Sequence, residues 1–157
     1  MRSPDAQPDL NDERRIEIAA LRPGHLTALI ELWTQSGLEV RRGGRDAPAE
    51  LQRQLSRNPE GFIGAFVAGR LVGFVLATDD DRRGWINRLA VHPDYRRQRL
   101  ARRLIAAAED VLKRRGMRIM AALIDDENIA SIATFTAAGY VDMPDVTYYS
   151  KRDDPDV

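Results

Sequence analysis

The chain has 157 residues, a length that fits one domain, and 43% of them are hydrophobic, which is enough to build a core. It contains no cysteine, so disulfides, thiolate metal ligands and a cysteine nucleophile are excluded, and its 2 histidines make a histidine-rich metal site unexpected. Basic and acidic residues balance at 24 each, so the net charge by itself selects no partner.

The N-terminal residues 1–14 are polar and do not resemble a signal peptide. No apolar run in the chain approaches the ~18 residues that cross a bilayer. We therefore expect a cytoplasmic protein without a membrane partner. Residues 1–13 are predicted to be a disordered tail, residues 14–152 a single domain and residues 153–157 a short C-terminal tail.

The first third of the domain predicts one strand and two helices. Residues 15–21 alternate polar and apolar positions, as a half-buried strand does. Residues 26–33 place apolar side chains at helical spacing, which predicts an amphipathic helix that ends near Gly37. A loop is expected at 39–46 and a short second helix at 48–57.

An antiparallel meander is expected next. Residues 62–77 contain two apolar, β-rich runs that flank residues 68–70, a pattern typical of a hairpin. A polar turn at 79–83 leads into another strand at 85–91.

The last part of the chain alternates helices and strands. A helix is expected from about residue 97 to 115, a strand at 117–124, a helix at 128–138, and two short strands at 140–143 and 146–149. The elements together predict a mixed α/β fold with a twisted, mostly antiparallel sheet of about seven strands, about four helices, and a βαβ unit in the second half.

The charge is unevenly distributed along the chain. Residues 82–118 carry a net charge of +9, whereas residues 119–157 carry −6. A concentrated basic block suggests an anionic ligand bound at one place. A solvated, arginine-rich helix face explains the block equally well.

The segment at 89–105, LAVHPDYRRQRLARRLI, combines this charge with a strand, a turn at His92-Pro93 and the start of a helix. The first N–H groups of a helix lack intrahelical partners and lie at the positive end of its dipole. Such a helix start suits a phosphate or pyrophosphate, and it is reinforced here by Arg96, Arg97, Arg99, Arg102 and Arg103.

The same segment resembles the acetyl-CoA motif of the GNAT N-acetyltransferases, Leu-x-Val-x-Pro-x-x-Arg followed by Gln/Arg-x-x-Gly-x-Gly/Ala. Residues 89–96, Gln98 and Leu100 carry this likeness. A later block of that family, Asn-x-x-Ala-Ile-x-x-Tyr-x-x-x-Gly-Phe, is matched by Asn128, Ser131, Ile132, Phe135, Gly139 and Tyr140. The resemblance covers about residues 16–151 and identifies the domain as a GNAT-like acyltransferase domain.

The resemblance implies acetyl-CoA as co-substrate; no metal is expected, because the chain has no cysteine and only 2 histidines. It assigns the pantetheine arm and the thioester carbonyl to the backbone of Leu89, Ala90 and Val91. It places the pyrophosphate against a segment whose members are Arg96, Arg97, Gln98, Arg99, Leu100, Ala101 and Arg102. Asn128 would hydrogen-bond the coenzyme, and as an asparagine before a helix it also suits an N-cap.

The sequence departs from the family pattern at three points. Arg97 and Arg99 stand where glycine is usual; an arginine there offers its N–H if its φ is negative and otherwise obstructs the pocket in part. Phe135 occupies the position of the usual tyrosine acid, and no glutamate stands on the strand at 85–88. The catalytic residues are therefore unassigned, and the substitutes left open are Tyr140, Tyr148, Tyr149, Asp125 and solvent.

We expect direct transfer of an acetyl group from acetyl-CoA to a primary amine, on a small molecule or a peptide whose identity stays open. Glu39 or Asp46 could meet this amine, and a plain solvated loop accounts for them as well. The alternative is a degenerate protein that holds a CoA thioester without turnover. A nucleic-acid partner is not expected, because a phosphate-bearing cofactor explains the basic block. A homodimer paired through a final strand is a further expectation.

Overall fold

A computed structural model describes residues 15–155 and residue 157; the predicted tail at 1–13 lies outside the described residues. The strands are β1 (Ile16–Ala20), β2 (Phe62–Val67), β3 (Arg70–Asp79), β4 (Gly84–Val91) and β5 (Met120–Ala121). The helices are α1 (Leu26–Gln35), α2 (Pro48–Arg57), α3 (Leu100–Arg114) and α4 (Ile129–Ala137), with 3-10 turns at Pro23–His25 and Pro93–Tyr95.

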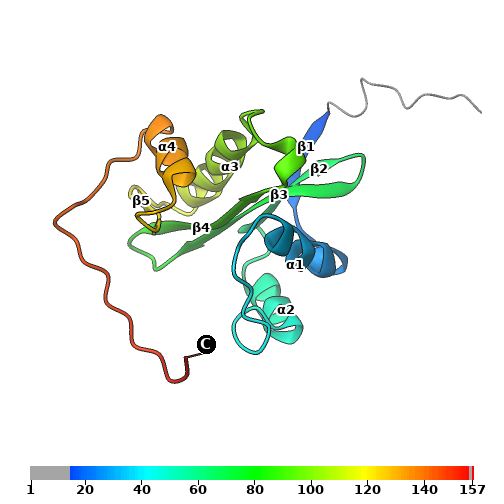
Figure 1. Ribbon diagram of the computed structural model, residues 1–157, viewed down its shortest axis with the longest axis horizontal. Helices are drawn as coiled ribbons and strands as arrows, with labels where there is room; N and C mark the ends of the chain where they lie inside the picture. The colour runs from blue at the N-terminus through cyan, green and yellow to red at the C-terminus, as the bar shows by residue number, and fades with distance from the viewer. Residues whose placement is uncertain (1–14, 156) are drawn as a thin grey trace, which may run out of the picture.

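The strands form one sheet in the order β1-β2-β3-β4-β5, antiparallel except for the parallel pair of β4 and β5. Helix α3 connects that parallel pair, which confirms the predicted βαβ unit. Figure 1 shows α3 and α4 on one face of the sheet and α1 and α2 on the other. The predicted mixed α/β class, the meander and the four helices are confirmed.

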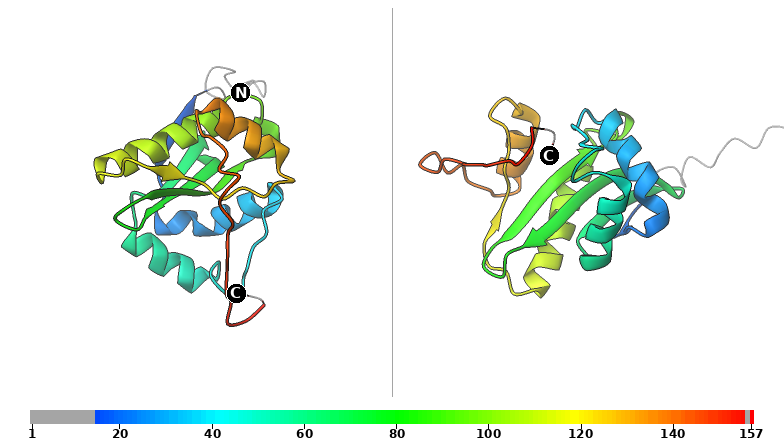
Figure 2. Two further views of the ribbon diagram at one scale, coloured as in Figure 1. Left: turned by 90° about the vertical axis from the view of Figure 1, so that its left-hand side faces the viewer. Right: turned by 90° about the horizontal axis from the view of Figure 1, so that it is seen from below.

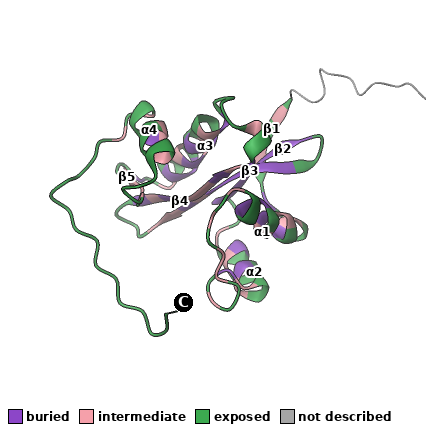
Figure 3. Cartoon of the chain, in the orientation of Figure 1, coloured by how far each residue is buried: buried purple, intermediate pink, exposed green. Residues whose placement is uncertain are grey.

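The two faces of the sheet bury separate apolar clusters, visible as the purple interior of Figure 3. One face packs against α3, whose Leu104 and Leu112 are fully buried. The other packs against α1 and α2, where Trp33 meets Phe74 edge-on with ring centroids 5.6 Å apart. Because β2 is covered on both sides, it reads as a continuous apolar run.

The predicted sheet of about seven strands is larger than the observed sheet of five. The strand expected at 117–124 shortens to the two residues of β5, and the strands expected at 140–143 and 146–149 do not form. Figures 1 and 2 show the chain after α4 standing away from the body. A strand needs the hydrogen bonds of a neighbour, and this segment lies beside none in the described chain.

None of the helices in the described part of the chain is long and apolar enough to cross a membrane.

The contact between β4 and α3 leaves no room for a side chain at Gly84. A methyl group on Gly84 would lie 2.7 Å from Cδ1 of Leu112, which is fully buried and cannot move aside. We expect Gly84→Ala to lower the free energy of unfolding by about 1–3 kcal/mol in urea titrations. Gly43→Ala is the control, because nothing lies within 4 Å of its new methyl group. Equal stability of the two variants would contradict this packing.

Candidate functional site

Strand β4 carries one residue more than β3 in the middle of their pairing. Asn87 lies opposite Leu76 and Ala90 opposite Phe74, so the register shifts between these pairs. Arg88, inside the bulge, has a φ of 54°, in the left-handed region. A bulge bends its strand and redirects the neighbouring side chains. The side chains of β4 after Asn87 therefore point in other directions than those of a regular strand.

In addition to the bulge, β4 lacks a strand partner along most of the edge that faces β5. Within the described chain the two strands pair only at the first two residues of β4, so the edge from 86 to 91 is open. The carbonyl of Val91 accepts hydrogen bonds from Ser36 Oγ and Arg96 Nε, both at 3.3 Å. The remaining backbone groups of this edge are available to a ligand.

A cavity of about 800 Å³, which we call the arginine cavity, opens along this edge. Its walls come from the end of β4, the segment that leads into α3, and α4. Gln98 is the one residue assigned by resemblance that does not line it. The others all do: Leu89, Ala90, Val91, Arg96, Arg97, Arg99, Leu100, Ala101, Arg102 and Asn128.

The segment before α3 keeps a glycine-like backbone although it contains arginines. Arg97 has a φ of 62° and Arg99 a φ of 59°, a conformation that costs a non-glycine residue about 1–2 kcal/mol. The φ angles are thus positive, which is the condition under which we expected obstruction. Both residues nevertheless line the cavity and leave it open.

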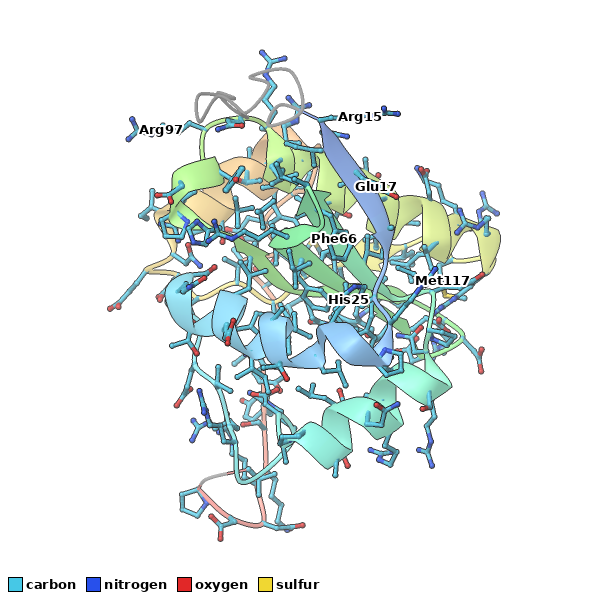
Figure 4. All side chains as sticks on the ribbon, turned by 90° about the vertical axis from the view of Figure 1, so that its right-hand side faces the viewer. Arg15, Glu17, His25, Phe66, Arg97 and Met117 are labelled. Atoms are coloured by element: carbon cyan, nitrogen blue, oxygen red, sulfur yellow. The ribbon has the colours of Figure 1, made fainter. Side chains whose placement is uncertain are left out.

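Positive charge at the mouth of the arginine cavity is not compensated by the protein. The side chains of Arg97, Arg99 and Arg102 form no ion pair within the described chain. Figure 4 shows Arg97 projecting outward from its loop. The α3 N-terminus, with Arg99 as a cap that makes no side-chain hydrogen bond, adds free N–H groups beside these charges. The arrangement suits an anion such as a pyrophosphate.

Asn128 takes the capping role and also lines the cavity. Its Oδ1 accepts a hydrogen bond from the backbone N–H of Ser131 at 3.1 Å, at the start of α4. The cap uses only this oxygen, and the amide nitrogen has no hydrogen-bond partner among the described residues, so it can donate to a ligand.

A second cavity of about 650 Å³, which we call the Trp33 cavity, adjoins the first. It lies between α1, the loop before α2, the middle of the sheet and α4. Glu39 and Asp46 both line it, together with Asp125 and Phe135. The residues common to both cavities are Gly37, Leu38, Leu89, Asn128 and Ser131. A molecule in one cavity can therefore reach a molecule in the other beside Leu89.

Arg88 is a residue of this cavity that the sequence did not single out. Its guanidinium lies 4.0 Å from the centre of the Trp33 ring and donates to the carbonyl of Glu39 at 2.9 Å and to Oδ2 of Asp46 at 3.4 Å. Burial lowers the pKa of Arg88, and the charge of Asp46 opposes that effect. A charged residue in the interior of a predicted strand was the one signal available in the sequence.

Tyr140 does not serve either cavity. Its hydroxyl donates to Oε1 of Glu109 at 2.9 Å, and its ring meets Phe135 edge-on. Burial raises the pKa of Tyr140, and the hydrogen bond to Glu109 raises it further. The hydroxyl therefore faces α3 and holds its proton.

Of the remaining candidates for proton transfer, only Asp125 lies in a cavity. Asp125 lines the Trp33 cavity, whereas Tyr148 and Tyr149 are exposed and line neither cavity. His92 lies in the turn that its place before a proline predicts, and its Nδ1 accepts from the N–H of Asp94 at 3.2 Å, but it is buried, where a surface position was expected.

Comparison with known proteins agrees with this geometry. The model of the Acetyltransferase (GNAT) family matches residues 19–140. An acetyltransferase of Sodalis glossinidius is 31% identical over 137 residues, which cover 87% of this chain and 95% of that protein. An acetyltransferase of Pectobacterium atrosepticum is 31% identical over 132 residues, or 84% and 92% of the two chains.

Solved structures share the fold at lower identity. The PaiA N-acetyltransferase of Thermoplasma acidophilum, in complex with coenzyme A, superposes with a TM-score of 0.71 at 21% identity and covers 78% of this chain and 87% of its own. The aminoglycoside N-acetyltransferase AAC(6')-Iy, in complex with a bisubstrate analogue, gives 0.69 at 23% identity and covers 88% and 99%.

The left-handed arginines predict an increase in stability when they are replaced. In Arg97→Gly and Arg99→Gly, relief of the backbone strain outweighs the entropy of glycine, so we expect the free energy of unfolding to rise by about 0.5–1 kcal/mol in each. Arg102→Gly, in the first turns of α3, should instead lower it by about 1 kcal/mol. Urea titrations measure all three. Destabilisation of all three alike would contradict the positive φ angles.

Proposed function

The chain belongs to the GNAT family of acetyltransferases, and from that premise we propose which of its residues bind acetyl-CoA and which receive the acceptor. The reaction is transfer of an acetyl group from acetyl-CoA to an amine. The arginine cavity holds the coenzyme and the Trp33 cavity holds the acceptor, and the reacting atoms meet beside Leu89.

The observation that carries this assignment is the open edge of β4 next to the start of α3. The pantetheine arm contains amide groups, and the open edge of β4 at Leu89 to Val91 can bind them as a neighbouring strand would, through backbone groups other than the Val91 carbonyl, which Ser36 and Arg96 already hold. When N–H groups of this edge donate to the thioester carbonyl, they polarise it, and its carbon is attacked more readily by the amine.

The pyrophosphate lies against the N-terminus of α3. The free N–H groups of Arg97 to Arg102 and the uncompensated side chains of Arg97, Arg99 and Arg102 provide the opposite charge. Arg96 is held in place by the carbonyls of Ser36 and Val91 and shapes the wall of the cavity. Asn128 supplies its amide from the opposite side.

The chemistry is a direct displacement. The neutral amine nitrogen forms a bond to the acyl carbon, the carbon–sulfur bond breaks, and the proton that the nitrogen loses balances the one that the CoA thiolate takes up, with solvent as carrier. The chain has no cysteine to carry the acyl group, and Phe135 has no proton to donate. Positioning of the amine against the thioester therefore provides most of the acceleration.

The acceptor is a small-molecule or peptide amine. The cavity offers one acidic and one basic side chain that form no ion pair in the described chain, Asp125 and Arg45, beside an apolar floor. Turnover is favoured over mere retention of a CoA thioester because the curated relatives are named acetyltransferases.

The coenzyme assignment predicts micromolar binding of acetyl-CoA in calorimetric titrations. Arg102→Ala should weaken it about threefold to tenfold, because one charge-assisted contact is lost. Arg114→Ala removes the same charge at the far end of α3 and should leave it unchanged. No binding at millimolar acetyl-CoA would contradict the assignment.

Turnover is measured with a thiol reagent and a panel of primary amines. Since the chain has no cysteine, the reagent detects only the CoA that the reaction releases. Release that depends on both enzyme and amine is expected, and its absence with every amine of a broad panel would contradict the activity.

A second copy of this chain is the partner that we propose for the C-terminal segment. Every exposed large hydrophobic side chain of the described residues lies at or beyond Ile119. Ile119 and Leu123 flank β5, whose outer edge is open, while Val146 and Tyr148 lie two residues apart on the extended segment after α4. Each copy thus offers both an edge and a segment to pair with it, so two copies close symmetrically.

Coexpressed single-cysteine variants test this pairing. Leu123→Cys copies and Val146→Cys copies should form a mixed disulfide, because a bridge requires Cα atoms within about 7 Å. Val146→Cys with Glu60→Cys, on the exposed turn before β2, is the control pair. Failure to cross-link, together with a monomeric mass by light scattering, would contradict the dimer.

A further inference from the structure

We propose that Arg88 is a positioning residue that fixes the loop at 38–46 against α1 and thereby sets the shape of the acceptor cavity. The inference rests on the proposed function, in which the Trp33 cavity receives the amine. It concerns a residue that neither the family motif nor the coenzyme site includes.

The bulge in β4 is what gives Arg88 this position. Because β4 has an extra residue between Asn87 and Ala90, Arg88 leaves the regular alternation of the strand and adopts its left-handed φ of 54°. Strained backbone of this kind persists only where surrounding contacts hold it. Here the contacts are made by the guanidinium.

Those contacts join three parts of the structure. The guanidinium stacks over the ring of Trp33 on α1, donates to the carbonyl of Glu39 at one end of the loop, and reaches Asp46 at the other end. Strand, helix and both ends of the loop thus meet at a single side chain.

Asp46 closes the loop from within. It is 4% exposed, and its Oδ2 accepts the backbone N–H of Arg41 at 2.8 Å as well as the Arg88 contact. The backbone adds hydrogen bonds from Asp46 to Arg41 and from Ala47 to Gly44. The loop therefore has one compact shape, and Arg88 fastens that shape to the sheet.

The loop so fastened forms one wall of the acceptor cavity. Leu38, Glu39, Arg45 and Asp46 all line it. Leu89, the next residue after Arg88, lines both cavities. Arg88 thus fixes the distance between the strand that presents the thioester and the wall against which the amine rests. Its loss should affect the acceptor and spare the coenzyme.

The test uses Arg88→Met, which keeps the apolar stem and removes the guanidinium. The matched control is Arg83→Met, because Arg83 also lies over a tryptophan, 5.5 Å from the ring centre of Trp85, outside both cavities. With an amine accepted by the wild type, Arg88→Met should raise the acceptor KM and lower kcat/KM about tenfold to hundredfold. The Kd for acetyl-CoA should stay within about twofold, and Arg83→Met should change neither constant.

Two readouts do not need turnover. Trypsin should cut after Arg41, Arg42 and Arg45 faster in Arg88→Met than in the wild type or in Arg83→Met, because the loop is released. In a Trp85→Phe background, the emission of Trp33 should shift to longer wavelength when Arg88 is removed and water reaches the ring.

The outcomes separate the two proposals. If the wild type acetylates no amine, the proposed function fails, and proteolysis and fluorescence still decide the role of Arg88. An unchanged acceptor KM with an uncut loop, or an equal loss of acetyl-CoA affinity, overturns the role of Arg88. If Arg88→Met does not fold, Asp46→Asn decides: it retains the acceptor for the Arg41 N–H and should produce the same pattern to a smaller degree.

Discussion

The positions of both cavities depend on one feature of the sheet: β4 and β5 pair at one end only and are not hydrogen-bonded further along. A sheet that paired along its whole length would present no free backbone at its centre, and the helices on both faces would close over a continuous core. Here the pairing of β4 and β5 stops after two residues on each strand, and the bulge in β4 bends it away from a regular course. Both cavities open at this gap, and Leu89 lies where they join.

The two cavities also differ in how their arginines are paired with acidic side chains. Four arginines of the basic segment 82–118 line the cavity where the coenzyme is proposed to lie, and none of them forms an ion pair in the described chain: Arg96, Arg97, Arg99 and Arg102. On the acceptor side two arginines are paired with acidic side chains: Arg88 lies against Asp46, and Arg41 against Glu39. An uncompensated charge binds an anionic ligand, whereas a compensated one holds the protein's own loop in place.

The short β5 also explains why the apolar side chains after α4 are exposed. Because β5 is short and has no outer neighbour, the segment after α4 finds no strand to join, and its apolar side chains remain in contact with water. Completion of the sheet by a second copy would cover those side chains. It would also support the chain at 122–125, which forms part of the acceptor wall.

The sequence by itself determined the class of fold, the four helices, the meander and the coenzyme motif. These depend on hydrophobic spacing and on residue types close together in the chain, such as Leu89 to Ala101, and local pattern is enough to read them. It also pointed to Asn128 as a helix cap, which the hydrogen bond to Ser131 confirms.

The tertiary structure alone decided the left-handed backbone at Arg97 and Arg99, the contact of Tyr140 with Glu109, and the role of Arg88 beside Trp33 and Asp46. It also decided that the last two expected strands do not form. Each of these depends on a neighbour distant in sequence: a strand forms only where a partner offers hydrogen bonds, and a side chain takes its role from the groups that folding places around it.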